Sequence, residues 1–203
     1  MYGAFGAVVT ALKDAVGSPY DFIPLDMMRY GEGGMAGYGS LCGAINGAAA
    51  AITLVAGEEH YKKPVAELLT WYTQTPFPTE ISNQYAVNHE FLVDELKTDE
   101  SLVQSVSGST LCHVSVTKWC LASGYASGSK ERGERCARLT SDVAAKAVEL
   151  LNLPADNTFE STLSLSEAAQ TCRSRHKKGD NFQAGQFTRG KEDCLSCHED
   201  PHQ

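Results

Sequence analysis

The sequence lacks an excess of positive charge, a long apolar run and any internal repeat. Its 203 residues include 17 Lys or Arg and 25 Asp or Glu, so the formal net charge is −8. A general nucleic-acid binder needs a basic face that replaces phosphate counterions, and this balance argues against one. The longest apolar segment, Leu41–Ala56, is too short and too interrupted by polar residues and glycines to span a bilayer. We therefore expect neither a nucleic-acid partner nor a membrane span.

A signal peptide is also missing from the sequence. Met1–Val9 has no basic start and leads directly into an amphipathic pattern, so we expect a mature or trimmed chain. Hydrophobic residues make up 42% and charged residues 21%, which is typical of a soluble globular protein.

Strand-like alternation is nearly absent, whereas helical periodicity is frequent. Helices are expected over Phe5–Val16, Leu41–Ala56, Pro64–Tyr72, Asn88–Leu96, Cys136–Leu151 and Ser164–Cys172. The expected caps are Gly57 after the second of these, Asn88 before the fourth, and a capping box of Ser164 and Glu167 before the last. Thr110–Leu121 is compatible with strand or helix, and its helical neighbours favour helix. The sequence thus predicts a mainly α fold of about six helices without a convincing sheet.

Two regions of different character follow from this pattern. A break near Pro154–Thr158 separates an α-helical body, residues 1–154, from an irregular C-terminal segment, residues 155–203. Residues 172–191 within that segment carry six basic groups and one acid, a local charge of +5 against −13 for the rest. This stretch is either a solvated loop, a cationic collar around an anionic cofactor, or a docking patch for an acidic partner.

The seven cysteines indicate cofactor ligation better than core packing. Their odd number argues against a pure disulfide framework. They are Cys42, Cys112, Cys120, Cys136, Cys172, Cys194 and Cys197.

The C-terminal pair belongs to a motif that attaches c-type haem. Cys194, Cys197 and His198 form C-x-x-C-H, in which both thiols reach the vinyl-derived carbons and the histidine lies under the iron. The same pair is also compatible with half of a zinc site, to which Cys172 and His176 supply the other half. The histidine that directly follows the second cysteine favours haem.

The remaining ligands of that haem stay open at this point. Candidates for the sixth iron ligand are His60, His89, His113, His176 and His202. Cys172 and His176 share the spacing of the haem motif, but Arg175 replaces its second cysteine. They could hold a second haem through one thioether, ligate the first haem through His176, or match by coincidence.

Cysteines of the helical body are compatible with an iron–sulfur cluster. Cys42 is expected in the first turn of a buried helix, where the helix dipole stabilises a thiolate. Cys120 and Cys136 flank the flexible connection Ser123–Ser129, which could bring their sulfurs together. Cys112 is harder to include, because eight helical residues put it about 12 Å from Cys120. It joins as a fourth ligand only if the helix breaks between them.

Gly31–Met35 and Cys42–Gly47 resemble the glycine and cysteine block of the C_GCAxxG_C_C redox family, and Cys120 and Cys136 resemble its last two cysteines. With the haem motif, residues 3–200 resemble the split-Soret cytochromes c. This resemblance implies a helical homodimer with haems near its interface, an axial histidine from the neighbouring subunit, and an iron–sulfur cluster, expected to be [2Fe–2S]. Cys42, Cys120 and Cys136 are its implied ligands. The chain departs from the family pattern by lacking a cysteine before the first helix.

The function predicted from these features is electron transfer between soluble redox partner proteins. The expected cofactors are one haem c, a second haem if Cys172 and His176 bind one, and the cluster; the expected location is periplasmic or extracellular. No catalytic residue is predicted. The alternatives are a haem-containing reductase with an open iron coordination site and a zinc-stabilised binding module.

Overall fold

The computed structural model describes residues 1–93, 96–153, 159–177 and 179–196. The chain divides into two compact units, unit 1 (residues 1–161) and unit 2 (residues 162–203). The boundary expected near Pro154–Thr158 falls outside the described residues. Phe159, which follows that gap, packs against the core of unit 1, so the described part of unit 1 extends past it.

Helices are the main secondary structure of the described residues, and the prediction of a mainly α fold is confirmed. The α-helices are α1 (Tyr2–Val16), α2 (Gly43–His60), α3 (Lys62–Gln74), α4 (Glu80–Val87), α5 (Cys112–Ser123), α6 (Lys130–Leu151) and α7 (Glu167–His176). The 3-10 turns are η1 (Tyr20–Phe22), η2 (Leu25–Gly31), η3 (Phe182–Ala184) and η4 (Cys194–Ser196). Two short antiparallel strands, β1 (Pro76–Phe77) and β2 (Ser105–Val106), form a minimal sheet.

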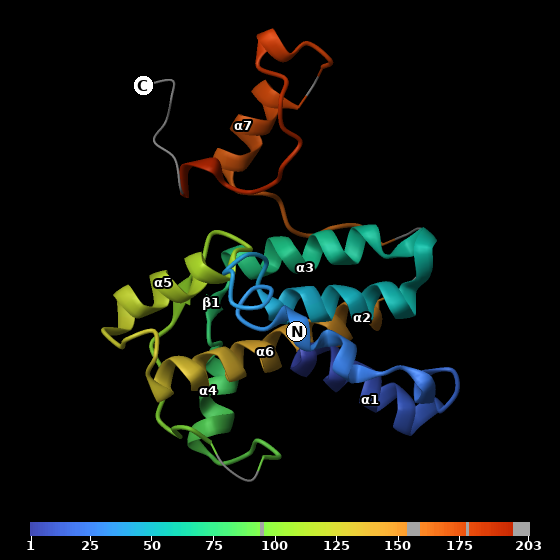
Figure 1. The fold of residues 1–203 in the computed structure, drawn as a ribbon, viewed down its shortest axis with the longest axis vertical. Coiled ribbons are helices and arrows are strands. Elements are labelled where there is room, and N and C mark those ends of the chain that lie inside the picture. The colour runs from blue at the N-terminus through green and yellow to red at the C-terminus, as the bar shows by residue number, and fades with distance from the viewer. Residues whose placement is uncertain (94–95, 154–158, 178, 197–203) are drawn as a thin grey trace. The chain divides into compact units, whose positions relative to one another are not determined.

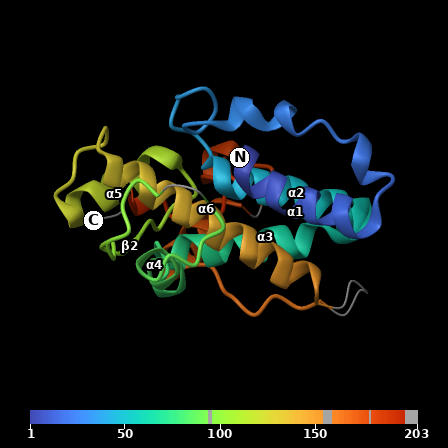
Figure 2. The ribbon, with the colours of Figure 1, turned by 90° about the horizontal axis from the view of Figure 1, so that it is seen from below.

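Unit 1 is organised around α2, which contacts α1, α3 and α6 (Figure 1 and Figure 2). Small residues make this central position possible. A Cβ on Gly47 would collide with the backbone carbonyl of Met1, and one on Gly43 with that of Gly31. The continuous apolar run of the sequence therefore becomes a helix buried among close neighbours.

Several predicted helix boundaries are confirmed and two are wrong. Gly57 interrupts α2 with φ 74°, and Thr110–Leu121 becomes the helix α5. Asn88 ends a helix instead of starting one, because Thr79 caps α4 and its position is fixed by hydrogen bonds to Asp142.

The described residues that follow Asn88 do not form the helix that was expected there. Leu92, which lies within the helix expected over Asn88–Leu96, is fully exposed, and Phe91 packs its ring against Tyr85. In unit 2, Ser166 and not Ser164 caps α7, because its hydroxyl accepts from the Ala169 N–H at 3.2 Å.

None of the helices in the described residues combines the length and the apolarity that a bilayer crossing needs.

Candidate metal centres

A backbone bridge between distant segments builds the thiol site of unit 1. Leu41 and Leu111 form an isolated antiparallel β-bridge. Cys42 N–H donates to Thr110 O at 2.9 Å, and Cys112 N–H donates to Ser40 O at 2.7 Å. Each cysteine comes one residue after a bridge partner, so both side chains leave the bridge on the same side. The bridge thus sets the N-cap of α2 beside the first residue of α5.

The glycine-rich segment before Cys42 lies against the same turn of α5. A Cβ on Gly34 would lie 2.8 Å from Cys112 Cβ, and one on Gly39 would lie 3.0 Å from His113 Cβ. Both glycines have positive φ, so a side chain at either position would also strain the backbone. Glycine is needed here because another backbone approaches closely.

Three thiols border one cavity of about 590 Å³ in unit 1. Cys42 comes from the N-cap of α2, Cys112 from the start of α5 and Cys136 from α6. The pKa of the Cys112 thiol is raised to about 11, most of all by burial and further by the neighbouring Cys42 and Cys136. Both neighbours therefore lie close enough to Cys112 to oppose its ionisation.

Cys120 does not border this cavity. It lies near the far end of α5, and the helix continues unbroken from Cys112 through Cys120. The bridge fixes the first turn of α5, not its last, beside Cys42. The family resemblance implied Cys120 as a ligand, whereas the pairing of Leu41 with Leu111, which brings Cys112 to the cavity, leaves no local signal in the sequence.

One buried polar atom at the cavity, Arg135 Nε, lacks a hydrogen-bond partner within the described residues. Burial raises the pKa of the Tyr72 phenol well above its usual value, and the neighbouring Cys42 adds to this effect. Arg135 Nη2 donates to Ser115 Oγ at 2.9 Å. A buried donor left unpaired at a cavity is consistent with a group that binds there.

The described residues contain no ready-made site for one small ion. Two thiolates on one tetrahedral zinc ion lie roughly 3.8 Å apart, given Zn–S bonds of about 2.3 Å. Throughout the part of the chain that the structure describes, no three His, Cys, Asp or Glu side chains come together closely enough for that. Soft donors around a cavity of this size suit a core of several irons better than a single ion.

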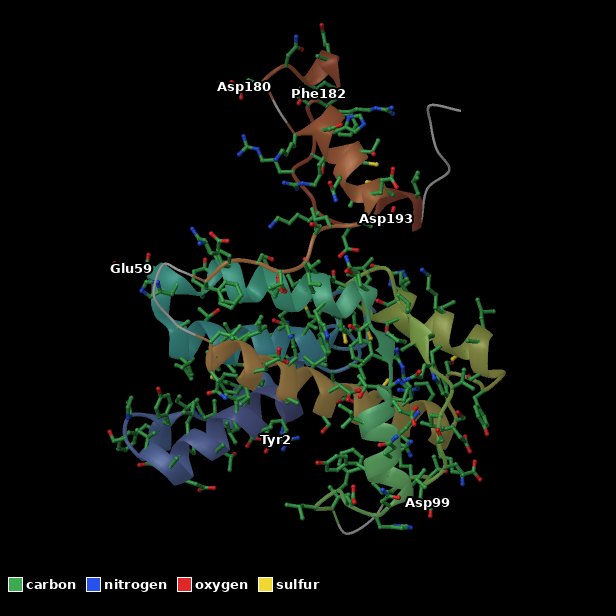
Figure 3. The ribbon with its side chains drawn as sticks, turned by 180° about the vertical axis from the view of Figure 1, so that it is seen from behind. Tyr2, Glu59, Asp99, Asp180, Phe182 and Asp193 are labelled. Atoms are coloured by element: carbon green, nitrogen blue, oxygen red, sulfur yellow. The ribbon has the colours of Figure 1, made fainter. Side chains whose placement is uncertain are left out.

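Unit 2 brings Cys172 and Cys194 together. Cys194 begins the turn η4, which packs against α7, the helix that carries Cys172. Burial raises the pKa of the Cys194 thiol, and the neighbouring Cys172 raises it further. Asp193, which caps this turn, and Phe182 mark opposite ends of unit 2 in Figure 3. Cys197 and His198, the rest of the haem motif, lie outside the described residues.

In two of the candidate histidines, Nδ1 lies within hydrogen-bond distance of a glycine carbonyl oxygen. His176 Nδ1 lies 2.7 Å from Gly185 O, and His113 Nδ1 lies 2.8 Å from Gly39 O. A carbonyl only accepts, so each ring carries its proton on Nδ1 and its lone pair on Nε2, the usual arrangement of a metal-bound histidine.

His60 and His89 do not border the cavity of the thiols. His60 ends α2 and is half-buried; His89 is exposed, with Nε2 3.2 Å from the Asp99 carboxylate. His202 lies outside the described residues.

Comparison with known proteins first identifies the family of this chain. The family described as "Putative redox-active protein (C_GCAxxG_C_C)" matches residues 3–150, and the chain belongs to this family. Over 199 residues the chain is 36% identical to the split-Soret cytochrome c of Desulfovibrio desulfuricans, covering 97% of this chain and 67% of that protein. A solved structure, described as "A novel iron centre in the split-Soret cytochrome c from Desulfovibrio desulfuricans ATCC 27774", superposes with a TM-score of 0.82. It is 33% identical and the match covers 98% of this chain and 79% of that one. The resemblance seen in the sequence is confirmed, and these relatives support a redox role.

Proposed function

We propose that this protein is an electron-transfer cytochrome with a covalent haem c in unit 2 and a [2Fe–2S] cluster in unit 1. The observation that carries the proposal is the C-x-x-C-H motif at Cys194–His198 in a chain 36% identical to a split-Soret cytochrome c. Cys194 and Cys197 bind the porphyrin, and His198 ligates its iron.

The surface of unit 2 has the chemistry that a haem requires. Phe182, Phe187 and Leu195 are exposed by 75%, 60% and 44%, an apolar surface that a porphyrin would cover. Arg175 and Arg189 are exposed as well, and cations of this segment suit the haem propionates. These exposed residues support the interpretation of residues 172–191 as a cationic collar around an anionic cofactor, rather than as a solvated loop.

His176 or His113 would supply the second histidine ligand of the haem iron. Both rings have their proton on Nδ1 and can ligate through Nε2. His113 projects from an exposed position of unit 1, which suits a ligand given to the haem of a second subunit in a homodimer. Cys172 lies beside Cys194 and could form the one thioether of a second haem.

Cys42, Cys112 and Cys136 hold the cluster in this proposal. They share one cavity, and their mutual effect on the Cys112 pKa supports their closeness. Haem and cluster supply one-electron chemistry when bound. The residues of the chain bind both groups, keep the cluster ligands away from bulk water and offer a charged face to redox partners in the periplasm or outside the cell.

The haem assignment is tested on protein matured in a host that attaches haem c. Intact mass and a pyridine haemochrome spectrum should show at least one porphyrin per chain, which C194S/C197S removes. C172S lowers the count only if a second haem is bound there. A wild-type chain of unmodified mass contradicts the assignment.

Carbon monoxide tests the axial position. Reduced wild-type protein should bind it slowly, because two histidines fill the axial sites of the iron. H176A or H113A should bind it rapidly, whichever supplies the ligand. Fast binding by the wild type would favour the reductase alternative.

The cluster assignment is tested by counting iron and acid-labile sulfide per chain, after subtracting haem iron. C42S, C112S and C136S should each lose the sulfide, whereas C120S should retain it. Loss in C120S with retention in C112S would restore the ligand set implied by the family resemblance.

A further inference from the structure

Arg135 is a buried cation without a counter-charge. Its side chain is 1% exposed and directly precedes Cys136 on α6. One guanidinium nitrogen, Nη2, donates to the neutral hydroxyl of Ser115 at 2.9 Å. Its Nε is buried without a hydrogen-bond partner, and no carboxylate of the described residues lies within ion-pair distance of this side chain.

The next arginine on the same helix shows how a buried charge is normally matched. Arg138 is equally buried, and its Nε donates to the Glu134 carboxylate at 3.0 Å. Asp142 is a buried carboxylate whose pKa is raised by burial, an effect that the charge of Arg135 opposes at longer range. The hydrogen bonds of Asp142, however, come from Thr79 and Ser82. A guanidinium stays charged at any pH in a protein, and an unpaired buried charge is strongly destabilising. Arg135 is therefore expected to have a negative partner that forms only in the loaded protein.

The cavity supplies that partner. Arg135 lines it together with Cys42, Cys112 and Cys136. Thiols lose their protons when they bind iron, so up to three negative charges appear there on loading. We propose that Arg135 is a positioning residue whose fixed positive charge compensates the thiolates of Cys42, Cys112 and Cys136 and favours the reduced form of the cluster. This inference rests on the cluster of the proposed function.

Two other arginines at the cavity differ from Arg135 in their surroundings. Arg132, one turn earlier on α6, is half-buried, and its Nε donates to Ser127 O at 2.5 Å. Arg29 is exposed and paired with Asp26 at 2.7 Å. Arg132 acts on the Cys112 thiol less than Arg135 does, and water screens the exposed charge of Arg29. Arg132 is thus the matched control: the same residue type, on the same helix and at the same cavity.

The experiment compares wild type, R135Q, R135K and R132Q as matured full-length protein. Three quantities are measured: iron and sulfide per chain, iron loss to a chelator, and the midpoint potential of the cluster. Far-UV circular dichroism checks the fold. R135Q should retain iron about tenfold more weakly, as is typical when an outer partner of a metal site is removed. Its cluster should titrate at a more negative potential, because the added electron loses a nearby positive charge.

R135K separates charge from packing. A lysine keeps the charge but not the planar fork, so its potential should stay nearer to wild type than that of R135Q. R132Q should differ little from wild type. A folded R135Q with wild-type potential and iron retention overturns the inference. If R135Q does not fold, R135K takes its place. Iron and sulfide contents equal to those of the wild type then support the inference, and contents as low as those of C112S overturn it. A wild type without sulfide would instead overturn the proposed cluster itself.

Discussion

At the scale of single residues, Cys112 has the environment that most clearly departs from that of a free thiol. It is desolvated, and Cys42 and Cys136 lie close enough to oppose its ionisation. Arg135 and Arg132 act in the opposite direction, but burial prevails. In the metal-free protein this residue is expected to be a neutral thiol at pH 7.

This environment predicts a pH dependence. A pKa raised from the ordinary value of 9.0 to about 11 means that folding favours the protonated thiol. Its contribution to stability is therefore fully present below pH 9.0 and is lost as the pH rises toward about 11. Alkylation of Cys112 in folded, metal-free protein should rise with a midpoint near the upper value, measured by peptide mass spectrometry. The same residue in urea is the control, and equal midpoints in both states would contradict the prediction.

Arg138 is the second residue whose environment leads to a quantitative expectation. Its side chain reaches the Glu134 carboxylate, the Asn83 amide oxygen and two backbone carbonyls, those of Thr98 and Glu100. Arg138→Met leaves Glu134 buried without its cation and should lower the free energy of unfolding by about 3–5 kcal/mol. Urea unfolding of the metal-free protein measures this. K146A, which removes the pair with the exposed Glu149, should change it by less than about 1 kcal/mol; equal losses would be inconsistent with the argument.

At the scale of elements, the approach of α2 to its neighbours depends on small residues. Gly47→Ala adds a methyl group that meets the Met1 carbonyl, a backbone atom that cannot move aside. Despite the better helix propensity of alanine, this substitution should cost about 1–3 kcal/mol of unfolding free energy.

The matched control is Gly133→Ala on α6. The new Cβ would lie 2.7 Å from Lys97 Nζ, the end of a flexible side chain that can move aside. This substitution should stabilise the protein by up to about 1 kcal/mol through helix propensity. Thermal melts of both variants decide the matter, and the prediction is wrong if Gly47→Ala is the more stable of the two.

Elements with strong local signals were predictable from the sequence, and those fixed by distant contacts were not. α1, α3 and α6 combine periodic apolar residues with recognisable ends. By contrast, Asn88 has the right chemistry to start a helix, but Asp142, 54 positions later in the chain, fixes the cap at Thr79 instead. A local pattern cannot report a hydrogen bond to a remote helix.

At the scale of the whole molecule, the two units differ in what stabilises them. The hydrophobic core consists of residues from unit 1. In the described part of unit 2, Ala169 is the one buried residue. With so little buried apolar surface to offset its chain entropy, the described part of unit 2 is expected to depend on the proposed haem for its order.

C194S/C197S should therefore affect the two units differently. Without covalent haem, unit 2 should become sensitive to limited proteolysis, with cleavage after residue 161. The melting temperature of the helical signal should stay within a few degrees of wild type, because the core of unit 1 is intact. C120S serves as the control for the loss of a cysteine. Global unfolding of the double variant would show that the haem supports unit 1 as well.

The sequence by itself determined the mainly helical fold, the haem motif and the family, because periodicity and short motifs are local properties. Only the tertiary structure decided which cysteines share a cavity. The bridge between Leu41 and Leu111 joins segments 70 positions apart, and it selects Cys112 for the cavity over Cys120. The burial of Arg135 beside those thiols was equally invisible in the sequence, since a charge in a helix is ordinarily expected to face water.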